Sequence, residues 1–425
     1  MQKVKKTKKK AVRNLPEEVK FCAKCVVPNT RPSTTNEYGH TTNHAHRFIE
    51  FDKEGVCSGC RFCEAKFDGT IDWKKREEEL LKLLATHRSK DGSYDCLVPG
   101  SGGKDSVYAS HILKSKYGMH PLTVTWAPHL YTDIGWKNFQ NWAHKAGHDN
   151  YLFTPNGEVH RSITRNAFLN LLHPFQPFIL GQKTFAVKMA ARFNIPLIFY
   201  GPHSGEEGSN IPVTQSQFIF KGSDVKETLG VRGGYRMDFV DPNTKLDEIY
   251  LGGISVASYM KKGVSYGDLA PYLPLDSRIV KKKRIKVYFL GYFMNWIPQD
   301  CYYHAVEHAD FEANPMRSEG TYTKYSSIDD KTDGFFYYTT FIKFGYGRAT
   351  LDAAQEIRHH HITREEGVAL VNKFDGEFPD KYFKEFLEYI DVTEDVFRKK
   401  VDSYRSSLLW KKKKSGEWEL RNRIE

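Results

Sequence analysis

Residues 94–106, YDCLVPGSGGKDS, decide the fold of this chain. The first six are an apolar run typical of a buried strand, and residues 100–106 are a glycine-rich turn. A helical pattern follows over residues 107–117, and residues 121–126 (PLTVTW) are a second expected strand. Strand, turn, helix and strand within about thirty residues predict a βαβ unit.

The glycine-rich turn has the composition of a phosphate-binding loop. Glycines lack a Cβ, so the backbone can bend and approach an anion closely; here they are Gly100, Gly102 and Gly103. Backbone N–H groups of the turn and the helix N-terminus would point at the phosphate, with hydroxyl donors from Ser101 and Ser106. The turn is not a Walker A loop, because Lys104 is followed by Asp105.

SGGKDS resembles the PP-loop of the ATP pyrophosphatase superfamily, whose members cleave ATP between the α and β phosphates. The resemblance implies ATP and Mg²⁺ as ligands. In that scheme Asp105 assists Mg²⁺ and Lys104 offsets negative charge, although the lysine could equally face solvent. The pyrophosphate would be cradled by Ser101, Gly102, Gly103 and Ser106.

The following segments alternate between helix and strand. We expect helices over residues 134–146, 159–172 and 183–193, and strands over 151–153 and 195–200. This predicts an α/β fold with a doubly wound parallel sheet, whose ligands lie beyond the carboxyl ends of the strands. Adenine should pack near Val124 and Trp126, with Gly201 at the same edge. Glu206 and Glu207 could bind Mg²⁺ or substrate, or be merely solvated.

Five of the seven cysteines fall within residues 22–63, as CxxC followed by CxxCxxC. Two CxxC pairs supply four thiolates that can converge on a tetrahedral Zn²⁺. We assign structural zinc to Cys22, Cys25, Cys57 and Cys60, and leave Cys63 outside the site. Free thiols and an iron–sulfur cluster remain alternatives.

The net charge of +11 comes from three short runs: seven Lys or Arg within residues 1–13, and four each at 281–284 and 411–414. These fifteen positive charges exceed the net charge by four, so the rest of the chain carries a net charge of −4. We therefore expect a solvated basic tail over residues 1–20 and no broad nucleic-acid surface. No stretch is apolar enough to span a bilayer or to act as a secretory signal, which favours a cytoplasmic protein.

Several longer motifs resemble the N-acetyl sugar amidotransferases of surface-polysaccharide and flagellin-sugar biosynthesis. They include CAKCVVPNTRP, GVCSGC, SGGKDS, TDIGWKNF, EGTYTKYSSIDD, FIKFGYGRATLDAAQEIR and ITREEGVALVNKFDG, and the likeness runs from residue 21 to about residue 410. The family converts an acetamido group of a nucleotide-activated sugar into an acetamidino group, as in pathways to pseudaminic, legionaminic or diacetamido-mannuronic acid derivatives.

The resemblance implies that adenylation of the amide oxygen makes it a good leaving group, which ammonia then displaces. It also implies separate glutaminase and cyclase-like subunits as the ammonia source. The chain itself has no N-terminal cysteine nucleophile, because residue 2 is Gln, and Cys96 and Cys301 lack a nucleophile-elbow setting.

Some positions depart from the family or stay open. GPHSGEEG (201–208) stands where Gly-Glu-Asn is expected, so the carboxylate role shifts to Glu206 or Glu207. Arg348 could clamp a sugar carboxylate or phosphate, or pair with Asp352. Gln182, with Lys183, is a further substrate-side candidate.

Two features near the C-terminus suit purely structural roles. Three consecutive histidines, His359, His360 and His361, suit a surface turn better than a metal site. Residues 363–366 (TREE) predict a helix capping box.

Two alternatives share these features: a tRNA-modifying PP-loop enzyme of thiolation or lysidine type, and a zinc-ribbon nucleic-acid-binding module. Sulfur transfer would need a cysteine near the ATP site, and Cys96 and Cys301 are poor candidates.

The expected organisation is a zinc module over 21–68, an ATP-binding α/β domain over 69–260 and a mixed C-terminal region over 261–425, helical from about Ala353.

Overall fold

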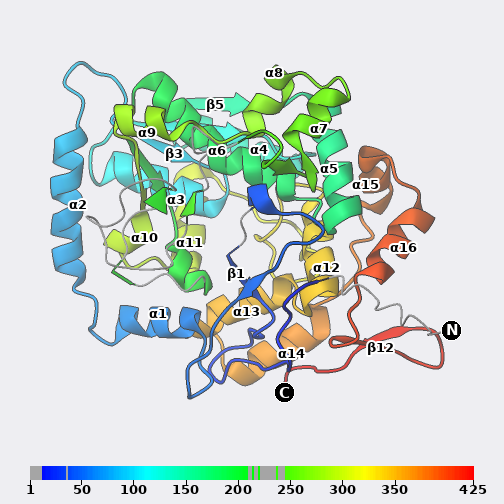
Figure 1. The fold of residues 1–425 in the computed structure, drawn as a ribbon. Coiled ribbons are helices and arrows are strands. Elements are labelled where there is room, and N and C mark those ends of the chain that lie inside the picture. The colour runs from blue at the N-terminus through cyan, green and yellow to red at the C-terminus, as the bar shows by residue number, and fades with distance from the viewer. Residues whose placement is uncertain (1–11, 35–36, 209–212, 215–218, 221–235, 238–244) are drawn as a thin grey trace.

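The computed structural model describes residues 12–34, 37–208, 213–214, 219–220, 236–237 and 245–425, so most of the expected basic tail lies outside the described residues. At its centre is a parallel five-stranded sheet in the order β11-β6-β3-β4-β5 (Figure 1). The strands are β3 (Cys96–Pro99), β4 (Pro121–Trp126), β5 (Asn150–Phe153), β6 (Leu197–Tyr200) and β11 (Lys286–Phe289). The predicted α/β class with a parallel sheet is confirmed.

Both faces of this sheet are covered, because successive strand residues point to opposite sides. Leu97 and Ile198 pack in one apolar cluster with α6 (Gln176–Phe193) and with α5 (Gly157–Leu171). Val98 and Phe199 pack in a second cluster with α2 (Trp73–His87), α3 (Lys104–Ser115) and the start of α11 (Pro298–Ala309). A third cluster joins α3 and α11 to α4 (Asp133–His144).

The helices begin where the sequence places capping residues. The Asp72 side chain accepts a hydrogen bond from the Lys75 N–H at the start of α2, and Thr132 accepts one from Gly135 at the start of α4. Helix α6 begins well before the predicted residue 183, with a proline in its first turn.

The N-terminal module contains little regular structure: β1 (Pro32–Thr34), the 3₁₀ turn η1 (Glu37–Gly39), β2 (Arg47–Phe48) and α1 (Ser58–Phe67). Shorter elements lie between the main strands of the sheet and around them. They are η2 (Ser204–Glu207), β7 (Ile219–Phe220), β8 (Arg236–Met237), β9 (Tyr250–Leu251), β10 (Ile254–Ser255), α7 (Val256–Lys261), α8 (Tyr266–Leu269), η3 (Ala270–Tyr272), α9 (Ser277–Lys283) and α10 (Leu290–Phe293).

The C-terminal region is helical and ends in a small antiparallel hairpin. It comprises α12 (Asp333–Phe344), α13 (Arg348–Arg358), α14 (Arg364–Phe374), α15 (Phe383–Ile390), α16 (Glu394–Ser403), β12 (Trp410–Lys412) and β13 (Trp418–Leu420). Helices begin earlier than the predicted Ala353, and the capping box at Thr363 and Glu366 is present. Strand β11, which follows residue 260, completes the central sheet. Within the described residues, no helix is long and apolar enough to cross a membrane.

Candidate functional site

The glycine-rich turn lies where the strand order reverses. β3 has β4 on one side and β6 on the other, so the loops after β3 and β6 meet at one edge of the sheet. Such a crevice is the usual ligand site of an open α/β sheet. Gly201, directly after β6, faces this crevice, because a Cβ on it would lie 2.8 Å from the Trp296 ring and 3.5 Å from the Asp105 backbone oxygen.

The turn needs its glycines. Gly102 has φ of +84°, and a Cβ there would lie 2.7 Å from the Cα of Phe139. A Cβ on Gly100 would lie 2.1 Å from the Cβ of Ser106. Gly103 is the N-cap of α3. The loop and the first turn of α3 therefore present backbone N–H groups at the carboxyl edge of the sheet.

Polar side chains of the turn contact one another. The Lys104 Nζ lies 2.6 Å from Asp105 Oδ2, and Trp296 Nε1 donates to Asp105 Oδ1 over 3.3 Å. The Ser106 hydroxyl donates to the Gly103 backbone oxygen over 2.9 Å. Lys104 is largely buried, with a 13% exposed side chain, so it does not face solvent.

A segment of the C-terminal region covers the glycine-rich turn. Ser101 and Asp329 line one pocket, and the Asp329 carboxyl interacts with the Ser101 side chain; burial and the neighbouring Asp330 raise the pKa of Asp329. A pocket of about 70 Å³ lies between the two segments, and it adjoins one of about 290 Å³ with which it shares Ser327 and Ile328. The smaller pocket is lined by Ser101, Gly102, Gly103, Gly135, Asn138, Phe311, Tyr325, Ser327, Ile328 and Asp329.

Asp330 fixes this covering segment to the loop after β4. Its Oδ2 accepts the His129 N–H over 2.8 Å, and its Oδ1 accepts the Thr332 N–H over 2.8 Å. The backbone continues the contact, since Thr132 donates to the Asp329 oxygen. Asp333, at the start of α12, is also buried, and burial raises its pKa to about 7. Several carboxyl groups therefore gather beside the turn.

Arg348 lies at the first turn of α13 and forms a partly buried ion pair. Its Nε lies 3.0 Å from Asp352 Oδ1, and its Nη1 donates to the Tyr337 hydroxyl over 2.6 Å. Of the two roles that the sequence left open, the pair with Asp352 is present. The positive charge of Arg348 also acts on Asp329 and Lys104, so Arg348 belongs to the surroundings of the turn.

The residues that the sequence placed near adenine or substrate lie in two different environments, one buried and one exposed. Val124 and Trp126 are 1% and 3% exposed in the apolar cluster under α6. Gly181 lets α6 rest on the Trp126 ring, since a Cβ on it would lie 2.0 Å from that ring. Gln182 is exposed on the next position of α6.

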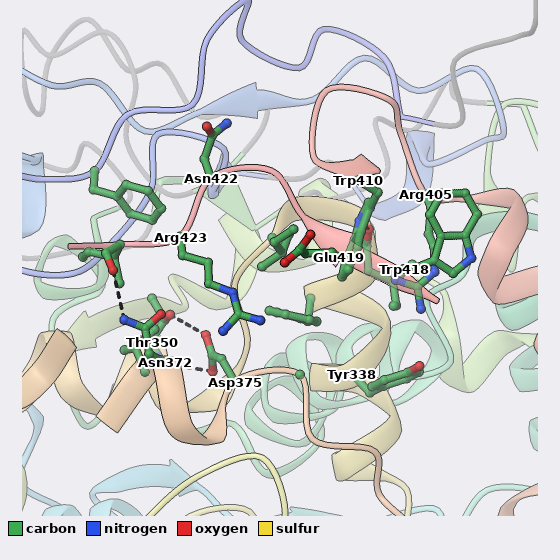
Figure 2. Close-up of a pocket in the computed structure, with 18 of the residues that line it drawn as sticks. Tyr338, Thr350, Asn372, Asp375, Arg405, Trp410, Trp418, Glu419, Asn422 and Arg423 are labelled. Carbon is green, nitrogen blue, oxygen red and sulfur yellow. Dashed lines mark hydrogen bonds between the residues drawn. The ribbon is translucent and has the colours of Figure 1, made fainter. Parts of the chain in front are cut away.

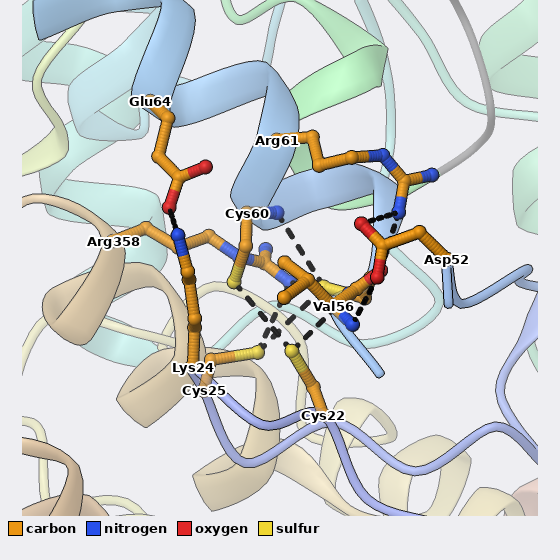
Figure 3. A network of polar contacts seen from close by, with 10 residues as sticks. Cys22, Lys24, Cys25, Asp52, Val56, Cys60, Arg61, Glu64 and Arg358 are labelled. Atoms are coloured by element: carbon orange, nitrogen blue, oxygen red, sulfur yellow. Dashed lines mark hydrogen bonds and ion pairs between the residues drawn. The ribbon is translucent and has the colours of Figure 1, made fainter. Parts of the chain in front are cut away.

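Four cysteines converge in the N-terminal module (Figure 3). Cys22 Sγ lies 3.8 Å from Cys60 Sγ, and Cys25 Sγ lies 3.8 Å from Cys57 Sγ. Sulfurs held about 2.3 Å from a tetrahedral Zn²⁺ lie roughly 3.8 Å apart, so the set fits zinc. Cys57 is the N-cap of α1, and its sulfur accepts the Cys60 N–H. Cys63 is buried beside this cluster, and burial raises the pKa of its thiol to about 12.

Arg358, at the end of α13, connects this cluster to the loop after β6. Its Nη2 lies 3.3 Å from Cys57 Sγ, and its Nη1 donates to the Glu206 backbone oxygen over 2.7 Å. The Glu206 carboxylate is buried and lies 3.1 Å from the buried Lys66 Nζ, whereas Glu207 is exposed. Burial raises the pKa of Glu206 to about 7.

The three histidines after Arg358 form a turn, but the expectation that all lie on the surface is wrong. His359 is 6% exposed, and its Nε2 lies 3.1 Å from Lys66 Nζ. It is buried because α13 ends against α1, which carries Lys66. His360 is exposed, and His361 Nδ1 contacts Glu356.

A further pocket of about 280 Å³ lies within the C-terminal region, bordered by the β12–β13 hairpin (Figure 2). Arg423, Glu419 and Asp375 border it. Asp375 accepts hydrogen bonds from the N–H groups of Gly347 and Thr350, and so fixes the start of α13. Burial raises the pKa of Asp375 to about 6.

Comparison with known proteins identifies the C-terminal region. Residues 319–425 match the family described as LPS biosynthesis protein WbpG-like, C-terminal domain. The match supports an enzyme with a role in lipopolysaccharide sugar biosynthesis. The chain is also 31% identical over 83 residues to an uncharacterized protein of Methanocaldococcus jannaschii; the alignment covers 20% of this chain and 29% of that protein.

The matched region supplies the segment that covers the glycine-rich turn. Asp329, Asp330 and Asp333 all lie within residues 319–425 and were not predicted as site residues. The pair Asp329–Asp330 closes the motif EGTYTKYSSIDD, so the signal was present in the sequence. Lys66 and Arg358 gave no such signal, because their partners are distant in the chain.

Proposed function

We propose that this chain is an ATP-dependent amidotransferase of lipopolysaccharide sugar biosynthesis. It would convert the acetamido group of a nucleotide-activated N-acetyl sugar into an acetamidino group, releasing AMP and pyrophosphate. One observation carries the proposal: the glycine-rich turn at the strand-order reversal is covered by Asp329, a residue of the WbpG-like region.

The chain would bind ATP through the turn of residues 100–106. Its backbone N–H groups and the N-terminus of α3 suit the negative charge of the β and γ phosphates. Lys104 adds a cation that is held close to the turn by Asp105. Positioning and electrostatic stabilisation of the departing pyrophosphate would supply most of the catalysis.

The carboxyl groups beside the turn suit Mg²⁺, which prefers oxygen ligands. Asp105 and Asp329 are the candidates to hold it, with Asp333 nearby. Mg²⁺ bound with ATP would neutralise charge on the phosphates.

The reaction balances without a redox partner. The amide oxygen attacks the α phosphorus of ATP, the α–β phosphoanhydride bond breaks, and pyrophosphate leaves. Ammonia then adds to the activated carbon and loses a proton, and the C–O bond breaks as AMP departs with the former amide oxygen. The sugar keeps an amidine in place of its amide.

The cysteine cluster would hold a structural Zn²⁺. A closed set of four thiolates leaves no open coordination position for substrate, so its contribution would be to stabilise the fold. Through Arg358, that contribution extends to the loop after β6.

Separate glutaminase and cyclase-like subunits would supply the ammonia. Glutamine-dependent turnover by the purified chain alone would contradict this ammonia source.

The direct test incubates the purified chain with ATP, Mg²⁺, ammonium salt and a panel of CMP- and UDP-linked diacetamido sugars. We expect AMP, pyrophosphate and a sugar product lighter by the difference between an oxygen atom and an NH group. Release of AMP that depends on tRNA and needs no sugar would instead favour a tRNA-modifying enzyme.

A further inference from the structure

Three histidines from two packed helices gather outside the turn and the cysteine cluster. His111 belongs to α3, and His304 and His308 lie one turn apart on α11. His111 Nδ1 lies 2.8 Å from His304 Nε2, and the ring centroids of His304 and His308 are 4.3 Å apart. One potential ligand atom of each histidine lies within 4.8 Å of the other two.

Carboxylates make little contact with these three histidines. Among the described residues, the one carboxylate oxygen within 4 Å of a nitrogen of these rings belongs to the largely exposed Glu307, at 3.8 Å from His308 Nε2. Burial and the neighbouring histidines lower the pKa of His304 to about 4, and burial, His308 and the Lys114 charge lower that of His111. The lowered pKa values keep His111 and His304 neutral near pH 7, which is the form that binds metal.

The three rings are also accessible. Each is partly exposed, and the His308 side chain is 36% exposed. A metal ion can therefore reach them from solvent, and three imidazoles leave a fourth position for water or another ligand.

A second group of potential metal ligands is less suited to bind an ion. Cys63, Glu206 and His359 lie equally close together, but the Lys66 ammonium lies 3.1 Å from both Glu206 Oε1 and His359 Nε2. A cation therefore already occupies the position that a metal would take. Within the part of the chain that the structure describes, no lysine forms a hydrogen bond with the rings of His111, His304 and His308, although the charge of Lys114 acts on His111.

We propose that His111, His304 and His308 bind a divalent transition-metal ion such as Zn²⁺, at a second site that is independent of the cysteines. Nitrogens held about 2.0 Å from a tetrahedral Zn²⁺ lie roughly 3.3 Å apart, so His111 and His304 need to separate only slightly. The ion would fasten α11 to α3. Because α3 begins at Lys104 and α11 follows Trp296, whose ring contacts Asp105, this fastening stabilises the arrangement of the glycine-rich turn.

The test uses the full chain, purified without a histidine tag and with its cysteine cluster loaded with zinc. Co²⁺ and Zn²⁺ are titrated by calorimetry into the wild type and into His304→Gln, His308→Gln and His111→Gln. His144→Gln is the matched control, because His144 is an exposed histidine at the end of α4.

We expect one further metal ion per chain in the wild type and in His144→Gln. Loss of an outer-shell partner of a metal lowers its affinity by about 10- to 100-fold. The variants of His111, His304 and His308 lose a direct ligand, so these cluster variants should bind the ion with an affinity lowered by more than that. The Co²⁺ spectrum should lack thiolate charge-transfer bands, and added Zn²⁺ should raise the melting temperature of the wild type but not of the cluster variants. Equal binding by wild type and cluster variants, each folded by circular dichroism, would overturn the proposal.

Discussion

The Arg358 guanidinium donates to the Glu206 backbone oxygen over 2.7 Å while its other nitrogen lies 3.3 Å from Cys57 Sγ. One side chain of the C-terminal region thus connects the cysteine cluster to the loop that follows β6. Arg358 is buried, so neither contact is shared with solvent.

Arg358→Gln should therefore destabilise the fold and weaken metal retention together. Breaking a buried charge pair by removing one partner costs about 3–5 kcal/mol. Thermal unfolding and zinc content measure the two effects. Arg192→Gln, on an exposed arginine near the end of α6, is the control and should change neither. Full zinc content in Arg358→Gln with an unchanged melting temperature would count against this connection.

The cysteine assignment predicts one zinc ion per chain, retained through gel filtration and removed by a chelator under mild denaturation. Cys57→Ser should lose the ion and much of its stability, because structural zinc contributes directly to folding. Cys63→Ala is the matched control: Cys63 is equally buried but lies outside the set of four. Loss of zinc from Cys63→Ala, or its retention by Cys57→Ser, would refute the assignment.

Gly102→Ala should abolish ATP binding. Its positive φ alone costs about 1–3 kcal/mol for a residue with a Cβ, and the new methyl group would also meet the Phe139 backbone. Gly92→Ala is the matched control, since Gly92 has φ of +83° but no atom of the described residues within 4 Å of an added Cβ. Calorimetric titration with ATP should find binding in Gly92→Ala and none in Gly102→Ala. Normal ATP affinity in Gly102→Ala would remove the turn from the site.

Asp333 should make stability depend on pH. Its pKa is raised by burial from 3.8 to about 7, so the folded state holds the proton more tightly than the unfolded chain. This group therefore stabilises the fold below about pH 4, and its contribution is lost as pH rises through about 7. Asp333→Asn should flatten the decline in the free energy of unfolding over this range. Asp395→Asn, on a 74% exposed carboxylate, should leave the decline unchanged. Equal slopes in wild type and Asp333→Asn would contradict the buried carboxyl.

The local elements could be predicted from the sequence because their signals are local. The strand and glycine turn before α3, the Asp72 cap and the Thr363 capping box depend on neighbouring residues, and all are present. Strand β11 was missed, since its four residues pair only with the distant β6. His359 was misplaced for the same reason, because its burial depends on Lys66 of α1. The partners of the turn, Asp329 and Trp296, likewise come from distant segments.

The products formed from ATP test the central claim most directly. With a CMP- or UDP-linked diacetamido sugar, ammonium salt and Mg²⁺, quantitative chromatography should detect AMP and pyrophosphate in equal amounts, and neither with Gly102→Ala. Release of ADP and orthophosphate, or no ATP consumption with any sugar of the panel by folded, zinc-loaded protein, would contradict it.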